Sequence, residues 1–130
     1  MKANEFRIGN LIETPMGNKE IGGVCETEAP YIRLKDERYI GYRLRDCNPI
    51  RLTENILLKC GFVAKTKTDD FYKDGIAIAS SYMTCRTEER SGFYLNLGNG
   101  NCPLNISINH VHELQNLYFA LTGEELKVEL

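Results

Sequence analysis

The sequence has 130 residues, of which 42% are hydrophobic and 26% charged, and its formal net charge is −2 at pH 7. This size and composition fit one globular domain with an apolar core and exclude a disordered chain. The small net charge excludes a strong overall field for nucleic acid or an anionic membrane, although a local basic patch is compatible with either.

The cysteines indicate a reducing compartment. They are odd in number and no two form a Cys-x-x-Cys pair, which argues against a disulfide framework and against a structural zinc site. No stretch has the roughly 18 apolar residues of a membrane helix, and the N-terminus lacks the apolar segment of a secretory signal. We therefore expect a cytoplasmic protein with reduced thiols and no membrane partner. The five cysteines are Cys25, Cys47, Cys60, Cys85 and Cys102.

The N-terminal third of the chain has the pattern of short strands joined by turns. Pro15–Asn18 is typical of a β-turn, and Gly22–Gly23 indicates a bulge or a sharp bend. Tyr31–Lys35 alternates apolar and basic residues as a half-buried strand does, and Arg38–Arg45 is its expected partner. Four or five such strands predict a small SH3-like β-barrel or a bent meander over residues 1–47.

Two helices are expected. The first begins after the N-cap Thr53 and ends at Gly61, and the second begins after the N-cap Asn109 and ends at Gly123. Apolar residues recur in the second helix at steps of three and four, which predicts a buried stripe. The stripe consists of Val111, Leu114, Leu117, Tyr118 and Leu121.

Residues 62–108, between the two helices, have the pattern of an antiparallel meander. The pairs Asp74–Gly75 and Asn99–Gly100 favour the tight turns that join antiparallel strands. Near the end of this region, apolar and polar residues alternate, which predicts a sheet with one apolar face covered by the C-terminal helix. The alternating residues are Leu104, Ile106 and Ile108.

The order of these elements predicts an α+β fold. A barrel-like β-rich lobe is followed by a short helix, an antiparallel β-meander and a C-terminal amphipathic helix packed on the sheet. We expect a single domain, residues 1–130, that divides into a lobe of residues 1–47 and a lobe of residues 48–130.

The sequence predicts no catalytic, metal-binding or cofactor-binding residues. His110 and His112 are the only histidines, and no cluster of acidic or cysteine residues beside them completes a metal site. An enzyme would need the thiol of Cys85 or Cys102 close to one of these imidazoles. Cysteines among strand residues are more often small buried hydrophobic residues, so we expect a protein that is not an enzyme.

The stretch from Tyr31 to Arg51 is the strongest candidate for binding. It is locally basic, and tyrosines lie between its arginines and lysine. On a small barrel such residues could bind single-stranded nucleic acid or an acidic peptide by phosphate or carboxylate pairing and ring stacking. A solvated strand face, on which arginine stems cover apolar surface, has the same pattern. The expected binding face consists of Tyr31, Arg33, Lys35, Arg38, Tyr39, Tyr42, Arg43 and Arg45.

Three stretches also carry a resemblance to known proteins. Ala3–Leu11, Ile50–Phe62 and Val111–Leu126 follow one another over most of the chain, and the last is the most specific. Together they resemble a group of short uncharacterised proteins encoded in gut-type bacterial genomes, phages and other mobile elements. That group has no assigned activity, so the resemblance implies a mobile-element context and gives no role to Cys60 or His112.

The sequence as a whole predicts a small non-enzymatic binding or accessory protein with a nucleic-acid or acidic-peptide partner. One alternative is a protein-interaction or self-associating module, in which an exposed strand edge or the tail Glu124–Leu130 contacts a partner or a second copy. The tail supports this alternative because apolar residues alternate in it, at Leu126, Val128 and Leu130. The other alternative is an enzyme that uses cysteine and histidine.

Overall fold

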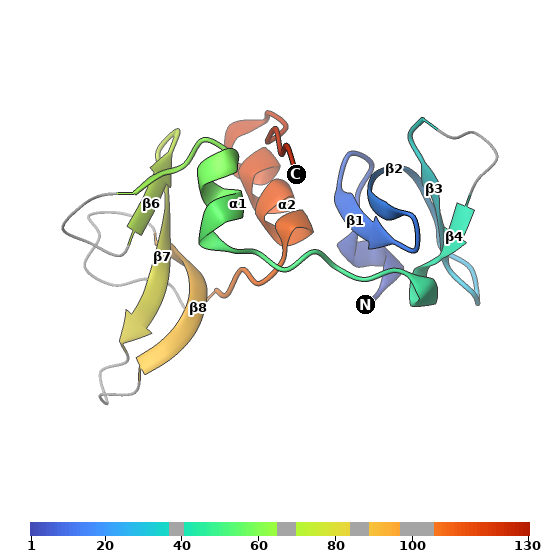
Figure 1. The fold of residues 1–130 in the computed structure, drawn as a ribbon, viewed down its shortest axis with the longest axis horizontal. Helices are drawn as coiled ribbons and strands as arrows, with labels where there is room; N and C mark the ends of the chain where they lie inside the picture. Colours follow the sequence, from blue (N-terminus) through green and yellow to red (C-terminus); the bar gives the residue numbers. More distant parts are fainter. Residues whose placement is uncertain (37–40, 65–69, 84–88, 97–105) are drawn as a thin grey trace. The chain divides into compact units, whose positions relative to one another are not determined.

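The computed structural model describes residues 1–36, 41–64, 70–83, 89–96 and 106–130. These residues form two four-stranded antiparallel sheets and two α-helices, with strand orders β1-β2-β3-β4 and β5-β6-β7-β8 (Figure 1). The predicted α+β class is therefore confirmed. Among the described residues, no helix is long and apolar enough to cross a membrane.

The contacts of the chain divide it into two compact units. The first unit combines Met1–Arg51 with His110–Glu125, and the second combines Leu52–Asn109 with Leu126–Leu130. This division differs from the expected lobes, because the C-terminal helix belongs with the N-terminal sheet rather than with the rest of residues 48–130. The sequence pattern could not indicate this, because an amphipathic helix shows that it needs a covering surface without showing which surface covers it.

The first unit contains a curled, half-barrel sheet in which neighbouring strands pair in order along the chain. The hairpin between the first two strands places Thr14 opposite Gly17, and the next turn places Cys25 opposite Tyr31. A curled sheet of this kind was one of the two predicted forms. Its elements are a 3-10 helix Ala3–Glu5, β1 Leu11–Thr14, β2 Gly17–Cys25, β3 Tyr31–Leu34, β4 Gly41–Arg43 and a second 3-10 helix Leu44–Asp46.

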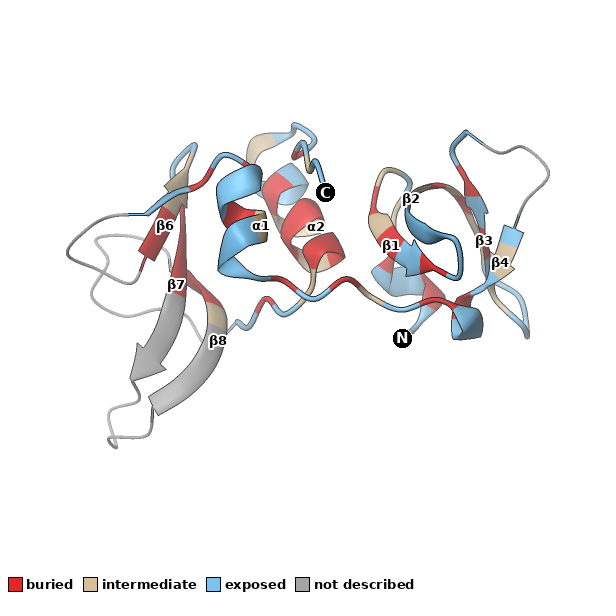
Figure 2. Ribbon diagram, in the orientation of Figure 1, coloured by how far each residue is buried: buried red, intermediate tan, exposed pale blue. Residues whose placement is uncertain are grey.

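The core of the first unit follows the alternation of its strands. Buried and exposed residues alternate along β3 (Figure 2), where Ile32 and Leu34 are buried and Tyr31 and Arg33 are exposed. This is the pattern of a sheet with one face packed and one face in solvent. The buried cluster consists of Ala3, Phe6, Ile12, Ile21, Ile32, Leu34, Leu44 and Cys47.

The predicted bulge at the glycine pair of β2 is confirmed. The register between β2 and β3 shifts between Ile21 and Gly23. A Cβ atom on Gly22 would lie 2.6 Å from the Cα atom of Lys35, a separation that no side chain permits. The two backbones therefore approach closely at this point, and only glycine fits there.

Helix α2, Val111–Thr122, begins one residue later than predicted. Its N-cap is His110, whose backbone is extended and whose N–H donates to Glu113 Oε2 at 3.3 Å. The predicted N-cap, Asn109, was wrong because the reciprocal glutamate lies three residues after His110, as in a capping box. The predicted end at Gly123 is confirmed by the left-handed φ of 74°.

The buried face of α2 agrees only in part with the predicted stripe. Val111, Leu114 and Tyr118 are buried, but Leu121 is 49% exposed, so its assignment to the core was wrong. Leu121 points in nearly the same direction as Leu114 but lies in the last turn, and periodicity does not show how far along a helix the covering surface extends. Two polar side chains, His112 and Gln115, are buried instead.

The second unit contains a short helix and the second sheet. Thr53 Oγ1 accepts a hydrogen bond from the Ile56 N–H at 3.3 Å, which confirms the predicted N-cap, and Gly61 follows the helix with a φ of 91°. The turn at Asp74 and Gly75 has positive φ at both residues, as predicted. The elements are α1 Glu54–Lys59, β5 Val63–Ala64, β6 Asp70–Lys73, β7 Ile76–Met83 and β8 Glu89–Asn96.

The predicted apolar strand before α2 is irregular in its described part. Ser107 forms an isolated bridge with Tyr94 of β8, and Ile108 is buried. Ile106 is 50% exposed, so its predicted place on a shared apolar face was wrong. A single bridge does not hold the regular pleat on which strand alternation depends. Leu104 and the predicted turn at Asn99–Gly100 lie outside the described residues.

Candidate functional site

The structure brings three residues of the predicted binding face together on the solvent side of the first sheet. Tyr31 and Arg33 alternate with buried residues along β3, and Arg43 of β4 lies directly opposite Tyr31 in the register. All three side chains are exposed. Of the other predicted residues, Arg38 and Tyr39 lie outside the described part of the chain.

Two glycines leave room for the tyrosine and an arginine to lie across neighbouring strands. The Cδ2 atom of Tyr31 is 3.7 Å from the position that a Cβ atom on Gly41 would take. On the other side of β3, the Nε and Nη2 atoms of Arg33 are 3.0 Å from the corresponding position at Gly23. We call the surface formed by Gly23, Tyr31, Arg33, Gly41 and Arg43 the outer face.

The ring of Tyr31 is accessible and its hydroxyl is engaged. The side chain is 40% exposed. A hydrogen bond with the Cys25 thiol on β2 is the main reason that the pKa of Tyr31 is raised above its ordinary value, and the nearby Arg33 lowers it. The phenol is therefore neutral at physiological pH, and a neutral, partly exposed ring beside arginines can stack on an aromatic ligand.

The sequence pattern placed Lys35 and Tyr42 on the expected binding face, but the structure engages both side chains elsewhere. Lys35 Nζ pairs with Glu20 Oε1 at 3.1 Å, and this contact raises the pKa of Lys35. Its charge is thus compensated locally. Tyr42 lies opposite Ile32 in the register and packs against the buried cluster, so its ring is partly covered. Neither residue adds an open cationic or stacking group to the outer face.

A groove of about 660 Å³ lies beside the outer face in the first unit. Arg43 belongs to both, and Arg45 of the second 3-10 helix also lines the groove. Leu44 and Cys47, which line it too, are almost completely buried, so part of the wall is apolar. The lining residues are Met1, Glu28, Ala29, Pro30, Arg43, Leu44, Arg45, Cys47, Asn48 and Pro49.

Three arginines in the described part of the chain carry open positive charge in this region. Within the described residues, Arg33, Arg43 and Arg45 form no ion pair. The one acidic residue in the lining of the groove is Glu28. Guanidinium groups without a carboxylate partner are suited to bind phosphate or carboxylate oxygens, frequently with two parallel hydrogen bonds. Sequence reasoning found Arg43 and Arg45 but missed Glu28, because only the folded loops bring it beside them.

Two of the described thiols, Cys47 and Cys60, are not activated nucleophiles. Burial raises the pKa of Cys47, and it raises the pKa of Cys60 to about 11, so both thiols are protonated at neutral pH. Cys85 and Cys102, the cysteines considered for catalysis, lie outside the described residues. The described residues include no group of three or more histidine, cysteine, aspartate or glutamate side chains that could hold a metal ion.

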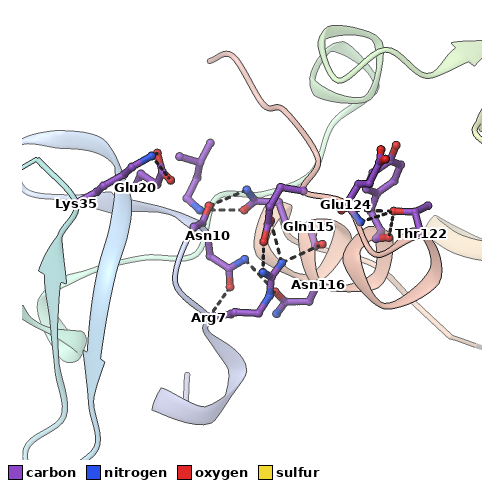
Figure 3. A network of polar contacts seen from close by, with 12 residues as sticks. Arg7, Asn10, Glu20, Lys35, Gln115, Asn116, Thr122 and Glu124 are labelled. Carbon is purple, nitrogen blue, oxygen red and sulfur yellow. Dashed lines mark hydrogen bonds and ion pairs between the residues drawn. The ribbon is translucent and has the colours of Figure 1, made fainter.

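A second polar cluster joins α2 to the segment that precedes β1, and the sequence did not predict it. Gln115 Oε1 accepts from the Leu11 N–H at 2.9 Å, and its Nε2 donates to the Gly9 carbonyl at 3.1 Å. Asn116 Oδ1 accepts from Asn10 Nδ2 at 2.9 Å (Figure 3). The Gln115 amide thus pairs with backbone groups at the start of the sheet, and the cluster connects α2 to this segment.

Arginine and aromatic contacts extend this cluster toward the end of α2. The Arg7 guanidinium lies 4.3 Å from the centre of the Phe119 ring and pairs with the Glu125 carboxylate. Arg7 Nε also donates to Asn116 Oδ1 at 3.2 Å. Arg7 is thus occupied within the chain and, unlike the arginines of the outer face, does not offer an open charge.

Comparison with known proteins adds no assignment. The chain matches no protein-family model, no curated protein and no solved structure. The outer face and the groove of the first unit are therefore the features that bear on function.

Proposed function

We propose that the protein is a small binding module, without catalysis of its own, that holds single-stranded nucleic acid on the outer face and in the adjoining groove. The observation that carries this proposal is the exposed ring of Tyr31 between two arginines, Arg33 and Arg43, that form no ion pair within the described residues. Stacking rings beside a basic track are what sequence-tolerant binding of single strands requires.

The geometry of the outer face supports a specific way of binding. A base can lie on the Tyr31 ring because Gly41 beside it has no side chain. The phosphates on either side of that base can then pair with Arg33 and Arg43. A neighbouring base can enter the groove against Leu44, because Arg43 belongs to both surfaces. Stacking of one base contributes about 1–3 kcal/mol, and the arginines add a term that weakens with salt.

Three further expectations from the sequence, on fold type, genomic context and location, belong to the same proposal. An SH3-like identity of the curled sheet and a cytoplasmic location are supported by the sequence patterns, and a mobile-element context by the resemblance of the three stretches, and we propose them together with the binding role. A single-strand binder of this size would act as an accessory to a larger nucleic-acid process.

The proposal is tested by fluorescence anisotropy with a labelled single-stranded oligothymidine. We expect Tyr31→Ala to weaken binding by about 5- to 150-fold, since it removes a stacked ring. Removal of Arg33 and Arg43 together should reduce the slope of log K against log salt by about 1.4, which is about 0.7 for each lost phosphate contact.

Lys35→Ala is the matched control for the arginine variants. It also removes one positive charge, from the residue that follows β3, but that charge is already paired with Glu20. We expect a less than threefold effect on binding. Equal effects of Lys35→Ala and Arg33→Ala would mean that only general charge matters and would contradict a site at the outer face.

An acidic peptide is the second candidate partner, and the partly apolar lining of the groove favours it. Leu44 and Cys47 could receive an apolar side chain while Arg43 and Arg45 pair with neighbouring carboxylates. Competition by a glutamate-rich peptide containing leucines separates the two partners. Binding of the peptide without binding of the oligonucleotide would replace the first proposal by the second, and binding of neither would reject both.

A further inference from the structure

His112 is a polar side chain buried at the start of α2. It is 2% exposed, and both ring nitrogens lack a partner within the described residues. Its ring stacks on Phe6 with a centroid distance of 4.3 Å and an interplanar angle of 30°. The ring of His110 also stacks with it, at a centroid distance of 5.6 Å and an interplanar angle of 15°. The imidazole thus fills an apolar position in the contact between α2 and the N-terminal segment.

A positive charge is unfavourable at this position for two reasons. Burial in an apolar surrounding removes the water that would solvate an imidazolium. His112 is also the second residue of α2, because the N-cap is His110, and the first turn of a helix disfavours cations. Proton uptake by the neutral ring would therefore oppose the folded arrangement.

The ionisable groups around His112 do not reverse this effect. Burial is the largest influence and lowers the pKa of His112 below its ordinary value of 6.5. The carboxylates of Glu113 on α2 and Glu5 on the 3-10 helix act in the opposite direction, and His110 adds to the lowering. Glu113 is itself engaged with His110 Nδ1 at 3.0 Å, so its carboxylate already has a partner.

We infer that His112 makes the contact between α2 and residues 5–11 sensitive to acid, so that the contact is closed at neutral pH and opens as the imidazole takes up a proton. His112 lies one turn before Gln115 and Asn116, whose amides hold Gly9, Leu11 and Asn10. A charged ring that moves toward water would separate Phe6 from the helix and would weaken these hydrogen bonds.

The direction of the pH effect follows from proton linkage. The pKa is lower in the folded protein, so the open state binds more protons at mildly acidic pH. The contact is therefore at full strength above about pH 6.5 and is lost progressively as the pH falls toward the folded pKa. The equilibrium constant for opening should rise by about tenfold per pH unit in that range.

The test uses NMR on the full chain between pH 7.5 and 5.5, above the range in which glutamates ordinarily titrate. The C2–H resonance of His112 gives its folded pKa. Exchange of the Leu11 amide hydrogen, corrected for intrinsic pH dependence, reports opening because this amide donates to Gln115. In the wild type we expect protection of Leu11 to fall by up to tenfold per pH unit below pH 6.5.

Two variants separate His112 from the other imidazole. His112→Phe keeps an aromatic ring against Phe6 but cannot take up a proton, so Leu11 protection should not depend on pH. His110→Asn keeps a residue suited to an N-cap and leaves the titratable ring of His112 in place, so Leu11 protection should still fall as the pH decreases.

Either of two results would overturn the inference. The first is a pH-dependent loss of protection that persists in His112→Phe. The second is a His112 resonance that titrates at or above 6.5 in the folded protein. The second measurement needs no variant, so it decides the matter even if His112→Phe does not fold.

Discussion

Gln115 shows how one side chain can connect a helix to a sheet. It is 3% exposed, and its amide satisfies one donor and one acceptor of the backbone just before and at the start of β1. A buried amide with both groups paired adds modest stability, whereas unpaired backbone groups left behind by its removal carry a large penalty. Gln115 is therefore more sensitive to substitution than its polar character suggests.

We expect Gln115→Leu to lower the free energy of unfolding by about 3 kcal/mol. Leucine has a similar size, so the loss comes from the unpaired Leu11 N–H and Gly9 carbonyl, at about 1–3 kcal/mol for each. Urea denaturation, followed through signals of the first unit, gives this value.

Leu121→Ala is the control on the same helix. Leu121 is 49% exposed, so we expect a change of less than about 0.5 kcal/mol. A loss of 2 kcal/mol or more for Leu121→Ala would mean that the predicted apolar stripe, rather than the observed face, is the buried one.

At the scale of elements, the bulge in β2 decides which side chains reach the outer face. The register shift after Ile21 follows from the close backbone approach at Gly22, while Gly23 leaves space for the Arg33 guanidinium. Two neighbouring glycines thus serve different purposes, the first for the backbone and the second for a side chain.

Alanine at these two glycines should separate stability from binding. Gly22→Ala brings a Cβ atom to 2.6 Å from the Lys35 Cα atom, so a strand must shift, and we expect a loss of about 2–3 kcal/mol. Gly23→Ala meets only the end of the flexible Arg33 side chain, so we expect a loss below about 1 kcal/mol, with weaker oligonucleotide binding. Thermal unfolding and anisotropy measure the two effects, and equal destabilisation would contradict the close approach at Gly22.

At the scale of the whole molecule, the chain passes between its two units three times. It leaves the first unit after Arg51, returns at His110 and leaves again after Glu125. The tail is part of this arrangement, because Leu126 is 3% exposed and belongs to the second unit. The proposed self-association through an alternating apolar tail is weakened accordingly, since one of its three apolar residues is already covered.

Because the first unit is built from two separate segments, residues 1–51 should not fold stably without residues 110–125. We expect the fragment of residues 1–51 alone to show little amide protection at Leu11–Thr14. Addition of a peptide of residues 110–125 should restore it, because the peptide supplies Gln115, Asn116 and the ring that covers Phe6. Hydrogen exchange by NMR measures both states, and native-like protection in the isolated fragment would contradict the observed division.

The sequence by itself determined the local structure. The N-cap at Thr53, the turn at Asp74–Gly75, the bulge at Gly22–Gly23 and the end of α2 at Gly123 depend on residues a few positions apart, whose backbone preferences act wherever the chain is placed. The alternation along β3 also predicted correctly that Tyr31 and Arg33 would be exposed.

Only the tertiary structure decided which surfaces meet. It placed α2 with the N-terminal sheet, buried His112 and Gln115, exposed Leu121, paired Lys35 with Glu20 and brought Glu28 beside Arg43. The pairings join residues that are distant in the chain. The burial of His112 and Gln115 and the exposure of Leu121 depend on how far the covering surface extends along the helix. Periodicity shows that a face needs burial, but the partner is selected by packing and hydrogen bonding over the whole folded unit.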